Sequence, residues 1–271
     1  MIGAIIGDII GSSYEFKNTH DYNFELFPKG SSFTDDTICT VAIADAILKG
    51  IPYRDSLIEW CRKYSKLKPM FGGAFSAWFL SDNPQPYNSF GNGSAMRVSP
   101  VGWAYHDMFS VLEEAEKSAW FSHGSIEGIT GAQAIALAIN HMVDNKSHTT
   151  HKEIIDNILR VYYGYNYLEN VPRPGEWNAT CQGCVPLALH LFLTSSSFEN
   201  AVRLAVSYGG DSDTMAAIVG SLAEAYYPIP ASLYEQALSY LPKDMLTVVY
   251  DFEKIYNPTA NYINCLSKLL N

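Results

Sequence analysis

Apolar residues recur at the spacing of an α-helix along nearly all of the 271 residues, and this period limits the fold more than any other feature. No segment alternates apolar and polar residues as a half-buried strand would, and no Pro/Gly-rich linker divides the chain. We therefore predict an all-α fold, with a single domain over residues 1–271. The nearly all-apolar segment 184–193 is expected to be buried, whatever its secondary structure. Helices are expected near 2–15, 34–49, 53–66, 110–122, 125–144, 151–163, 198–206, 214–227, 232–240 and 243–256, with a helical tail to Leu270.

The charge balance excludes some classes of partner. Lys and Arg total 18 against 28 Asp and Glu, which gives a formal net charge of −10. This balance argues against an extended nucleic-acid surface and against binding to anionic membranes, although a compact nucleotide site needs only a few donors. The five cysteines are an odd number, the first residues lack a basic leader, and no window is apolar for the length of a membrane span. We predict a cytoplasmic monomer.

Three glycines form a row in the first predicted helix. Gly3, Gly7 and Gly11 recur every four residues and therefore lie along one face. Glycine costs helix stability, so such a row indicates close approach by another backbone or by a ligand, and both interpretations stay open here. Asp8 and Glu15 are seven residues apart, two helical turns along a shared face.

Two acidic turns, Thr34-Asp35-Asp36 and Asp211-Ser212-Asp213-Thr214, precede apolar helices although they lie about 175 residues apart. Each is explained as a helix N-terminus with acids in its first turn, which stabilises the helix dipole. Because both combine Asp with Thr, they are also typical of a site for hard cations, which prefer carboxylate and hydroxyl oxygens. If a fold joins them, four Asp bring a charge of −4, which two divalent cations would cancel. The six side chains would fill about half of two octahedral coordination shells, which leaves an open, catalytic kind of site.

A Gly-rich turn, Gly91-Asn92-Gly93-Ser94, is predicted to open a helix and suits an anion through its free N–H groups, although an ordinary Gly-rich cap explains it too. It is neither a P-loop nor a dinucleotide fingerprint. Cys181 and Cys184 have no second pair to complete a zinc site, so core or loop cysteines are the favoured interpretation.

Taken together, these motifs resemble the ADP-ribosylglycohydrolases, the family of the dinitrogenase reductase-activating glycohydrolase and the ADP-ribosyl-arginine and -serine hydrolases. The resemblance runs through nearly the whole chain. It is carried by Gly7-Asp8-Ile9-Ile10-Gly11 with Glu15, Thr34-Asp35-Asp36-Thr37, Gly91-Asn92-Gly93-Ser94-Ala95-Met96-Arg97, Ser122-His123 and Gly209-Gly210-Asp211-Ser212-Asp213-Thr214.

This resemblance implies a single compact orthogonal helical bundle with a central dinuclear site for two Mg²⁺, or Mn²⁺. It implies that Glu15 lies at the mouth of the site. Because four Asp already neutralise two divalent cations, we hypothesise that Glu15 is a weak ligand that is free to gate the site or to act as the catalytic base, and Asp36 is the other candidate for the catalytic base. The implied metal ligands are Thr34, Asp35, Asp36, Asp211, Asp213 and Thr214. The implied substrate-binding residues are Gly91, Asn92, Gly93, Ser94, Met96, Arg97 and His123.

The expected function is metal-dependent hydrolysis of the glycosidic bond at C1″ of ADP-ribose, which removes ADP-ribose from a modified protein or another acceptor. Two alternatives stay open: a protein that senses ADP-ribose without turnover, and a hydrolase of a free metabolite such as O-acetyl-ADP-ribose. The linkage that is cut depends on rim residues, so the motifs do not identify it.

Overall fold

The computed structural model describes residues 1–66, 70–143 and 151–270. Within these ranges the chain forms α-helices, one 3₁₀ turn, η1 (Tyr167–Glu169), and no strand, so the predicted all-α fold is confirmed. The helices are α1 (Ile2–Gly11), α2 (Asp35–Lys49), α3 (Tyr53–Ser65), α4 (Gly73–Leu80), α5 (Gly93–Met96), α6 (Ser99–Ala104), α7 (Met108–Trp120), α8 (Ile126–Val143), α9 (His151–Tyr163), α10 (Cys181–Thr194), α11 (Phe198–Tyr208), α12 (Ser212–Tyr226), α13 (Ala231–Leu238), α14 (Lys243–Tyr256) and α15 (Ile263–Leu270).

Most helix ends lie within two residues of their predicted positions, and residue 144 lies outside the described ranges. The first helix is the main exception, because it ends at Gly11 instead of continuing to residue 15. Beyond Gly11 the chain tightens into a turn, in which the Tyr14 N–H bonds to the Gly11 carbonyl at 2.8 Å. Glu15 therefore lies on a loop and not on the helical face predicted for it.

The apolar segment 184–193 is helical and buried at most of its positions. It lies within α10, which begins three residues before it and contains Pro186. The Thr180 hydroxyl caps this helix by accepting a hydrogen bond from the Gly183 N–H at 3.1 Å. The cap explains why the helix begins ahead of the apolar run.

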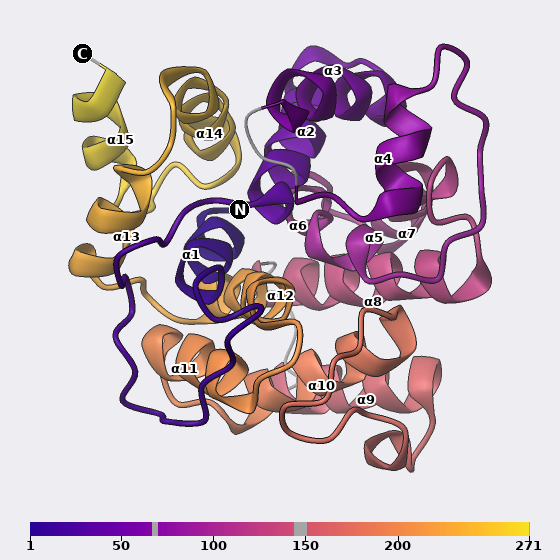
Figure 1. The fold of residues 1–271 in the computed structure, drawn as a ribbon, viewed down its shortest axis with the longest axis vertical. Coiled ribbons are helices and arrows are strands. Elements are labelled where there is room, and N and C mark those ends of the chain that lie inside the picture. The colour runs from indigo at the N-terminus through magenta and orange to yellow at the C-terminus, as the bar shows by residue number, and fades with distance from the viewer. Residues whose placement is uncertain (67–69, 144–150, 271) are drawn as a thin grey trace.

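Helix α1 lies beside α12 in the interior of the molecule, and every residue of α1 is buried (Figure 1). A Cβ atom added to Gly7 would lie 1.9 Å from the Ala216 carbonyl oxygen, and one added to Gly3 would lie 2.2 Å from that of Gly220. At Gly11 the nearest atom would be the Asp213 Cα, at 2.5 Å. The glycine row thus serves the close approach of another backbone, and it brings α1 against the start of α12.

The start of α1 is held by a buried charge cluster. The amino nitrogen of Met1 lies 2.9 Å from Glu224 Oε2 on α12 and 3.0 Å from Glu253 Oε1 on α14. The Tyr262 hydroxyl lies 2.6 Å from Glu224 Oε1 and 3.0 Å from Glu253 Oε2. These contacts fix α1 relative to α12 and to the C-terminal helices. Of the helices in the described ranges, none has the length and apolarity needed to cross a membrane.

Candidate active site

Asp8 is a fully buried carboxylate in α1 that fixes the chain at the start of α2. Its Oδ1 accepts a hydrogen bond from Thr34 Oγ1 at 2.7 Å, and its Oδ2 accepts one from Thr34 N at 2.8 Å. The Thr37 N–H and hydroxyl also donate to Oδ2. Burial raises the pKa of Asp8, although these four donors oppose the rise. Asp8 therefore ties the first acidic turn to α1.

Thr34 is the N-cap of α2, as predicted, and its side-chain oxygen accepts a hydrogen bond from the Asp36 N–H at 3.3 Å. This cap places Asp35 and Asp36 in the first turn of the helix. Asp36 is buried and Asp35 is half-buried. The capping interpretation is thus locally correct, and it holds both carboxylates in fixed positions.

The second acidic turn begins with two glycines in the left-handed region, Gly209 at φ 81° and Gly210 at φ 84°. A Cβ atom on Gly210 would lie 2.6 Å from the Glu176 carbonyl oxygen. The Asn18 amide clamps the same residue, since its Oδ1 accepts from the Gly210 N–H at 2.8 Å and its Nδ2 donates to the Gly210 carbonyl at 2.9 Å. These constraints direct the chain into α12 with its acids facing α2.

The two acidic turns meet directly. Thr214 Oγ1 donates to Asp36 Oδ2 at 3.2 Å, although 178 residues separate them. Asp211 Oδ2 accepts a hydrogen bond from Asn92 Nδ2 at 2.7 Å. Carboxylate oxygens of Asp8, Asp36 and Asp213 lie within 4.8 Å of one another, and those of Glu15, Asp211 and Asp213 do the same.

A cavity of about 320 Å³ opens onto these carboxylates. Of the predicted site residues, only Thr34 and Ser94 do not line it. Those that do are Glu15, Asp35, Asp36, Gly91, Asn92, Gly93, Met96, Arg97, His123, Asp211, Asp213 and Thr214. The fold therefore gathers both acidic turns and the Gly-rich turn around one space.

Burial and mutual repulsion perturb the carboxylates of the cavity. The pKa of Asp36 is raised well above its usual value by burial and then by the charge of Asp8, and the pKa of Asp213 is raised by burial and then by Asp36. At the mouth, burial and then the charge of Asp211 raise the pKa of Glu15 to about 7. Such crowding of negative charge favours a bound cation.

The donor set fits a divalent cation. Asp36 Oδ1 is buried, and no hydrogen-bond donor reaches it within the described ranges. Leaving a buried acceptor unpaired is costly, whereas a cation beside it would supply the missing partner. Carboxylate and threonine oxygens are the ligands that Mg²⁺ and similar hard ions prefer.

The Gly-rich turn lines the same cavity as the acids, and its Asn92 side chain bonds to Asp211. Its Asn92 N–H bonds to the Ala179 carbonyl at 2.9 Å, and the helix that follows, α5, has only four residues. Ser94 is fully buried, and its hydroxyl donates to the Gly128 carbonyl at 2.7 Å, away from the cavity. Ser94 therefore offers no hydroxyl to a ligand in the cavity, which it does not line.

His123 packs on this turn, since a Cβ atom on Gly93 would lie 2.9 Å from His123 Nε2. Arg97 is buried behind it, and its Cζ lies 5.7 Å from the ring centres of both Phe75 and Phe121. Burial, and then the positive charge of Arg97, lowers the pKa of His123 well below 6.5. His123 is therefore neutral near pH 7.

Sequence reasoning missed the hydrogen bonding of Asp8 and the bond from Asn92 to Asp211. A charged residue inside the apolar run 2–11 is a signal that could have identified Asp8. Trp177 lines the cavity and stacks on Phe16, with ring centres 5.9 Å apart and planes 14° apart.

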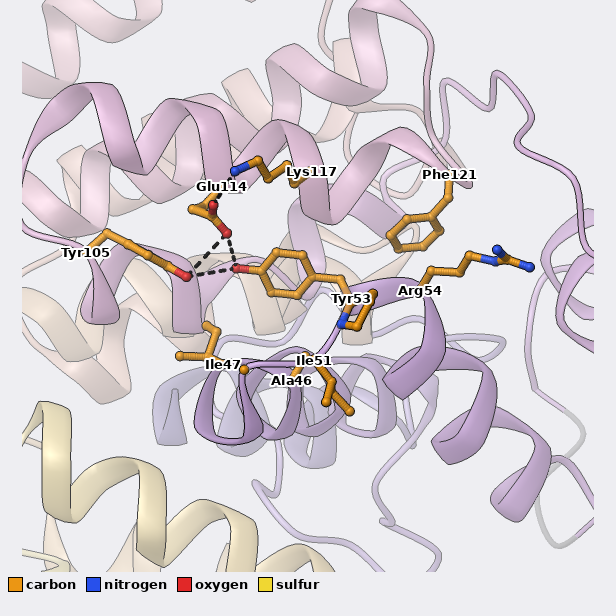
Figure 2. Close-up of a pocket in the computed structure, with 11 residues that line it drawn as sticks. Ala46, Ile47, Ile51, Tyr53, Arg54, Tyr105, Glu114, Lys117 and Phe121 are labelled. Atoms are coloured by element: carbon orange, nitrogen blue, oxygen red, sulfur yellow. Dashed lines mark hydrogen bonds and ion pairs between the residues drawn. The ribbon is translucent and has the colours of Figure 1, made fainter.

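A second cavity, of about 420 Å³, lies between the start of α3 and α7 (Figure 2). Its polar centre is Glu114, which accepts hydrogen bonds from the Tyr53 hydroxyl at 2.8 Å, the Tyr105 hydroxyl at 3.2 Å and Lys117 at 2.7 Å. None of the predicted site residues lines it. Each polar group named here is satisfied by another side chain, so we treat this cavity as structural.

Comparison with known proteins gives consistent results. Residues 1–259 match the sequence model of the family described as ADP-ribosylglycohydrolase. ADP-ribosylhydrolase ARH3 of Bos taurus is 24% identical over an alignment of 328 residues including gaps. The alignment covers 91% of this chain and 89% of that protein. ADP-ribosyl-[dinitrogen reductase] glycohydrolase of Rhodospirillum rubrum is 21% identical, with 84% of each chain covered. A solved structure described as an ADP-ribosylglycohydrolase-related protein complex superposes with a TM-score of 0.67 at 22% identity, over 99% of this chain and 94% of that chain, and so agrees in fold.

Proposed function

The chain belongs to the ADP-ribosylglycohydrolase family, and we propose on this premise that it is a metal-dependent hydrolase of the glycosidic bond at C1″ of ADP-ribose. Family membership supports hydrolysis of ADP-ribose linkages in general. The substrate proposed here is ADP-ribose attached to a modified protein or another acceptor.

Two Mg²⁺, or Mn²⁺, ions would be held by the oxygens of the two acidic turns: Thr34, Asp35, Asp36, Asp211, Asp213 and Thr214. When bound, the ions would supply positive charge for the hydroxyl oxygens of the ribose. Hydrogen bonds to neighbouring side chains would hold two of these ligands in place without an ion. Asp8 holds Thr34, and Asn92 holds Asp211.

One of two carboxylates of the cavity acts as the general base. Glu15 or Asp36 accepts a proton from the water that attacks C1″, while the bond from C1″ to the acceptor breaks and the acceptor leaves with a proton. Glu15 lies at the mouth of the cavity, is only half-buried and stands on a loop, so it is the more accessible of the two. The buried carboxylates stabilise the oxocarbenium character that develops at the sugar.

The Gly-rich wall is assigned to the rest of the substrate. Gly91, Asn92 and Gly93 let a phosphate approach the backbone, while Met96, Arg97 and His123 line the same side of the cavity. Ser94 supports this wall through its bond to Gly128. The buried guanidinium of Arg97 adds positive charge beside the same cavity.

One observation carries the proposal: Thr214 Oγ1 bonds to Asp36 Oδ2, so motifs from the two ends of the chain share one cavity. Two isolated helix caps would have no reason to meet. The unpartnered Oδ1 of the same Asp36 supports a cation at this junction.

The test is a panel of ADP-ribosyl linkages, to arginine, to serine, to a nucleic-acid base and in O-acetyl-ADP-ribose, incubated with Mg²⁺ or with EDTA. Chromatography of released ADP-ribose is expected to show turnover of at least one linkage, and only with the metal. Binding of ADP-ribose without release from any linkage would identify a sensing protein and contradict the proposal.

The variant Glu15→Gln separates the two carboxylates. If Glu15 is the base, kcat is expected to fall by about 10²- to 10⁴-fold, because general base catalysis contributes about that much. Full turnover in this variant would contradict that role and leave Asp36 as the base. The cytoplasmic location and the monomeric state stay predictions.

A further inference from the structure

A chain of hydrogen bonds connects Arg97 to His123 through Ser122. Arg97 Nη2 lies 2.8 Å from Ser122 Oγ and 2.9 Å from the Ser118 carbonyl oxygen. Ser122 Oγ lies 2.9 Å from His123 Nδ1. Arg97 and Ser122 are at most 1% exposed, and His123 is 5% exposed. These groups therefore have little water to bond with.

The direction of each bond follows from the donors available. A guanidinium can only donate, so Ser122 Oγ accepts from Arg97 and keeps its own hydrogen to give. The neighbouring acceptor is His123 Nδ1. If Nδ1 carried the proton instead, Ser122 Oγ would accept twice and its buried hydrogen would be left unpaired, which is costly. The neutral ring therefore carries its proton on Nε2.

Nε2 is the ring nitrogen on the side of the cavity. It faces the Gly-rich turn, since a Cβ atom added to Gly93 would lie 2.9 Å from it and one added to Gly91 would lie 3.6 Å from it. His123 itself lines the cavity. A proton on Nε2 thus makes the ring a hydrogen-bond donor toward whatever rests on the Gly-rich turn.

We infer that Arg97 and Ser122 are positioning residues that hold His123 as a neutral Nε2–H donor to an anionic oxygen of the substrate. The donor role rests on the proposed function, because the anion is the phosphate of ADP-ribose. The relay, by which we mean the hydrogen bonds from Arg97 through Ser122 to His123, does not depend on the proposed function. Arg97 acts here through Ser122, and its ring contacts with Phe75 and Phe121 keep the guanidinium in place.

The test combines ¹⁵N NMR of the histidine rings with binding of ADP-ribose by calorimetry. His123 is assigned with His123→Gln, and its wild-type spectrum is expected to show a protonated Nε2 and an unprotonated Nδ1. In Ser122→Ala the two tautomers should mix, and ADP-ribose should bind about tenfold more weakly, the loss expected for one hydrogen bond to a charged group. Ser122→Thr, which keeps the hydroxyl, should restore both readouts.

Ser221→Ala is the matched control, because its equally buried hydroxyl bonds, among the residues that the structure describes, only to the Ile218 carbonyl of the same helix. It should leave the His123 spectrum and the affinity unchanged. A proton on Nδ1 in the wild type, or an unchanged tautomer and affinity in Ser122→Ala, would overturn the inference. If the wild type bound no ADP-ribose, the proposed function would fail with the donor role, while the spectrum would still decide the relay.

Discussion

The contact between α1 and α12 leads to a quantitative prediction for Gly7→Ala. The added Cβ would lie 1.9 Å from the Ala216 carbonyl oxygen and 2.4 Å from its carbon, so the helices must separate by about 1.5 Å to reach ordinary contact at 3.4 Å. Overpacking of a rigid core costs up to about 3 kcal/mol, and the better helix propensity of alanine returns about 1 kcal/mol. We expect a loss of about 2 kcal/mol in the free energy of unfolding.

Thermal and urea unfolding measure this loss, and the midpoint temperature should fall by about 6 °C for a chain of this size. Gly73→Ala is the control, because no atom of the described residues lies within 4 Å of a Cβ atom at that helical position, and it should be neutral or slightly stabilising. A Gly7→Ala protein within about 0.5 kcal/mol of the wild type would show that the backbones are free to separate, and the packing argument would be wrong.

Three further predictions concern the support of the site. Asn92→Ala removes the amide that bonds to Asp211, so Mg²⁺ affinity by calorimetry should fall about 10- to 100-fold, and unchanged affinity would contradict this role. Asp8→Asn places an amide NH₂ group against the N–H and hydroxyl donors of Thr34 and Thr37, and should lower the free energy of unfolding by about 3 kcal/mol. An unaltered urea midpoint would refute the importance of the hydrogen bonds to Asp8. The ring signals of His123 should not move between about pH 8 and about pH 6, because its pKa lies well below 6.5, and a titration midpoint near 6.5 would count against its burial.

The helices were largely predictable because their ends carry local signals. Thr34 caps α2, and Gly50 ends it in the left-handed conformation at φ 62°. The end of α1 was not predictable from its pattern, since Tyr14 turns back to bond to Gly11 and to pack on Phe24 in the following loop. The length of α5, four residues, was not predictable either, because a Gly-rich turn indicates where a helix begins but not how far it extends.

The members of the site were indicated by motif and resemblance, but the hydrogen-bond partners of their side chains were not. Asn92 was expected to contact substrate, yet its side chain bonds to Asp211, which lies 119 residues away in the sequence. Ser94 belongs to the same motif, but its hydroxyl faces α8. Side-chain direction depends on long-range packing, which a single sequence does not specify.

The glycine row illustrates the same limit. Its spacing indicated close approach on one face of the first helix, but a backbone and a ligand were equally compatible with it. The partner proved to be α12, the helix that carries the second acidic turn. The row thereby helps to bring Asp8 and Asp213 within reach of each other.

We propose above that the two acidic turns form one binding site for two divalent cations. Titration of the protein with Mn²⁺, followed by calorimetry, tests it with one variant from each turn, Asp36→Ala and Asp211→Ala. The account predicts two ions per wild-type chain and the loss of at least one ion in each variant, with the helical circular dichroism of both retained. No bound ion in the wild type, or full binding in either variant, would contradict it.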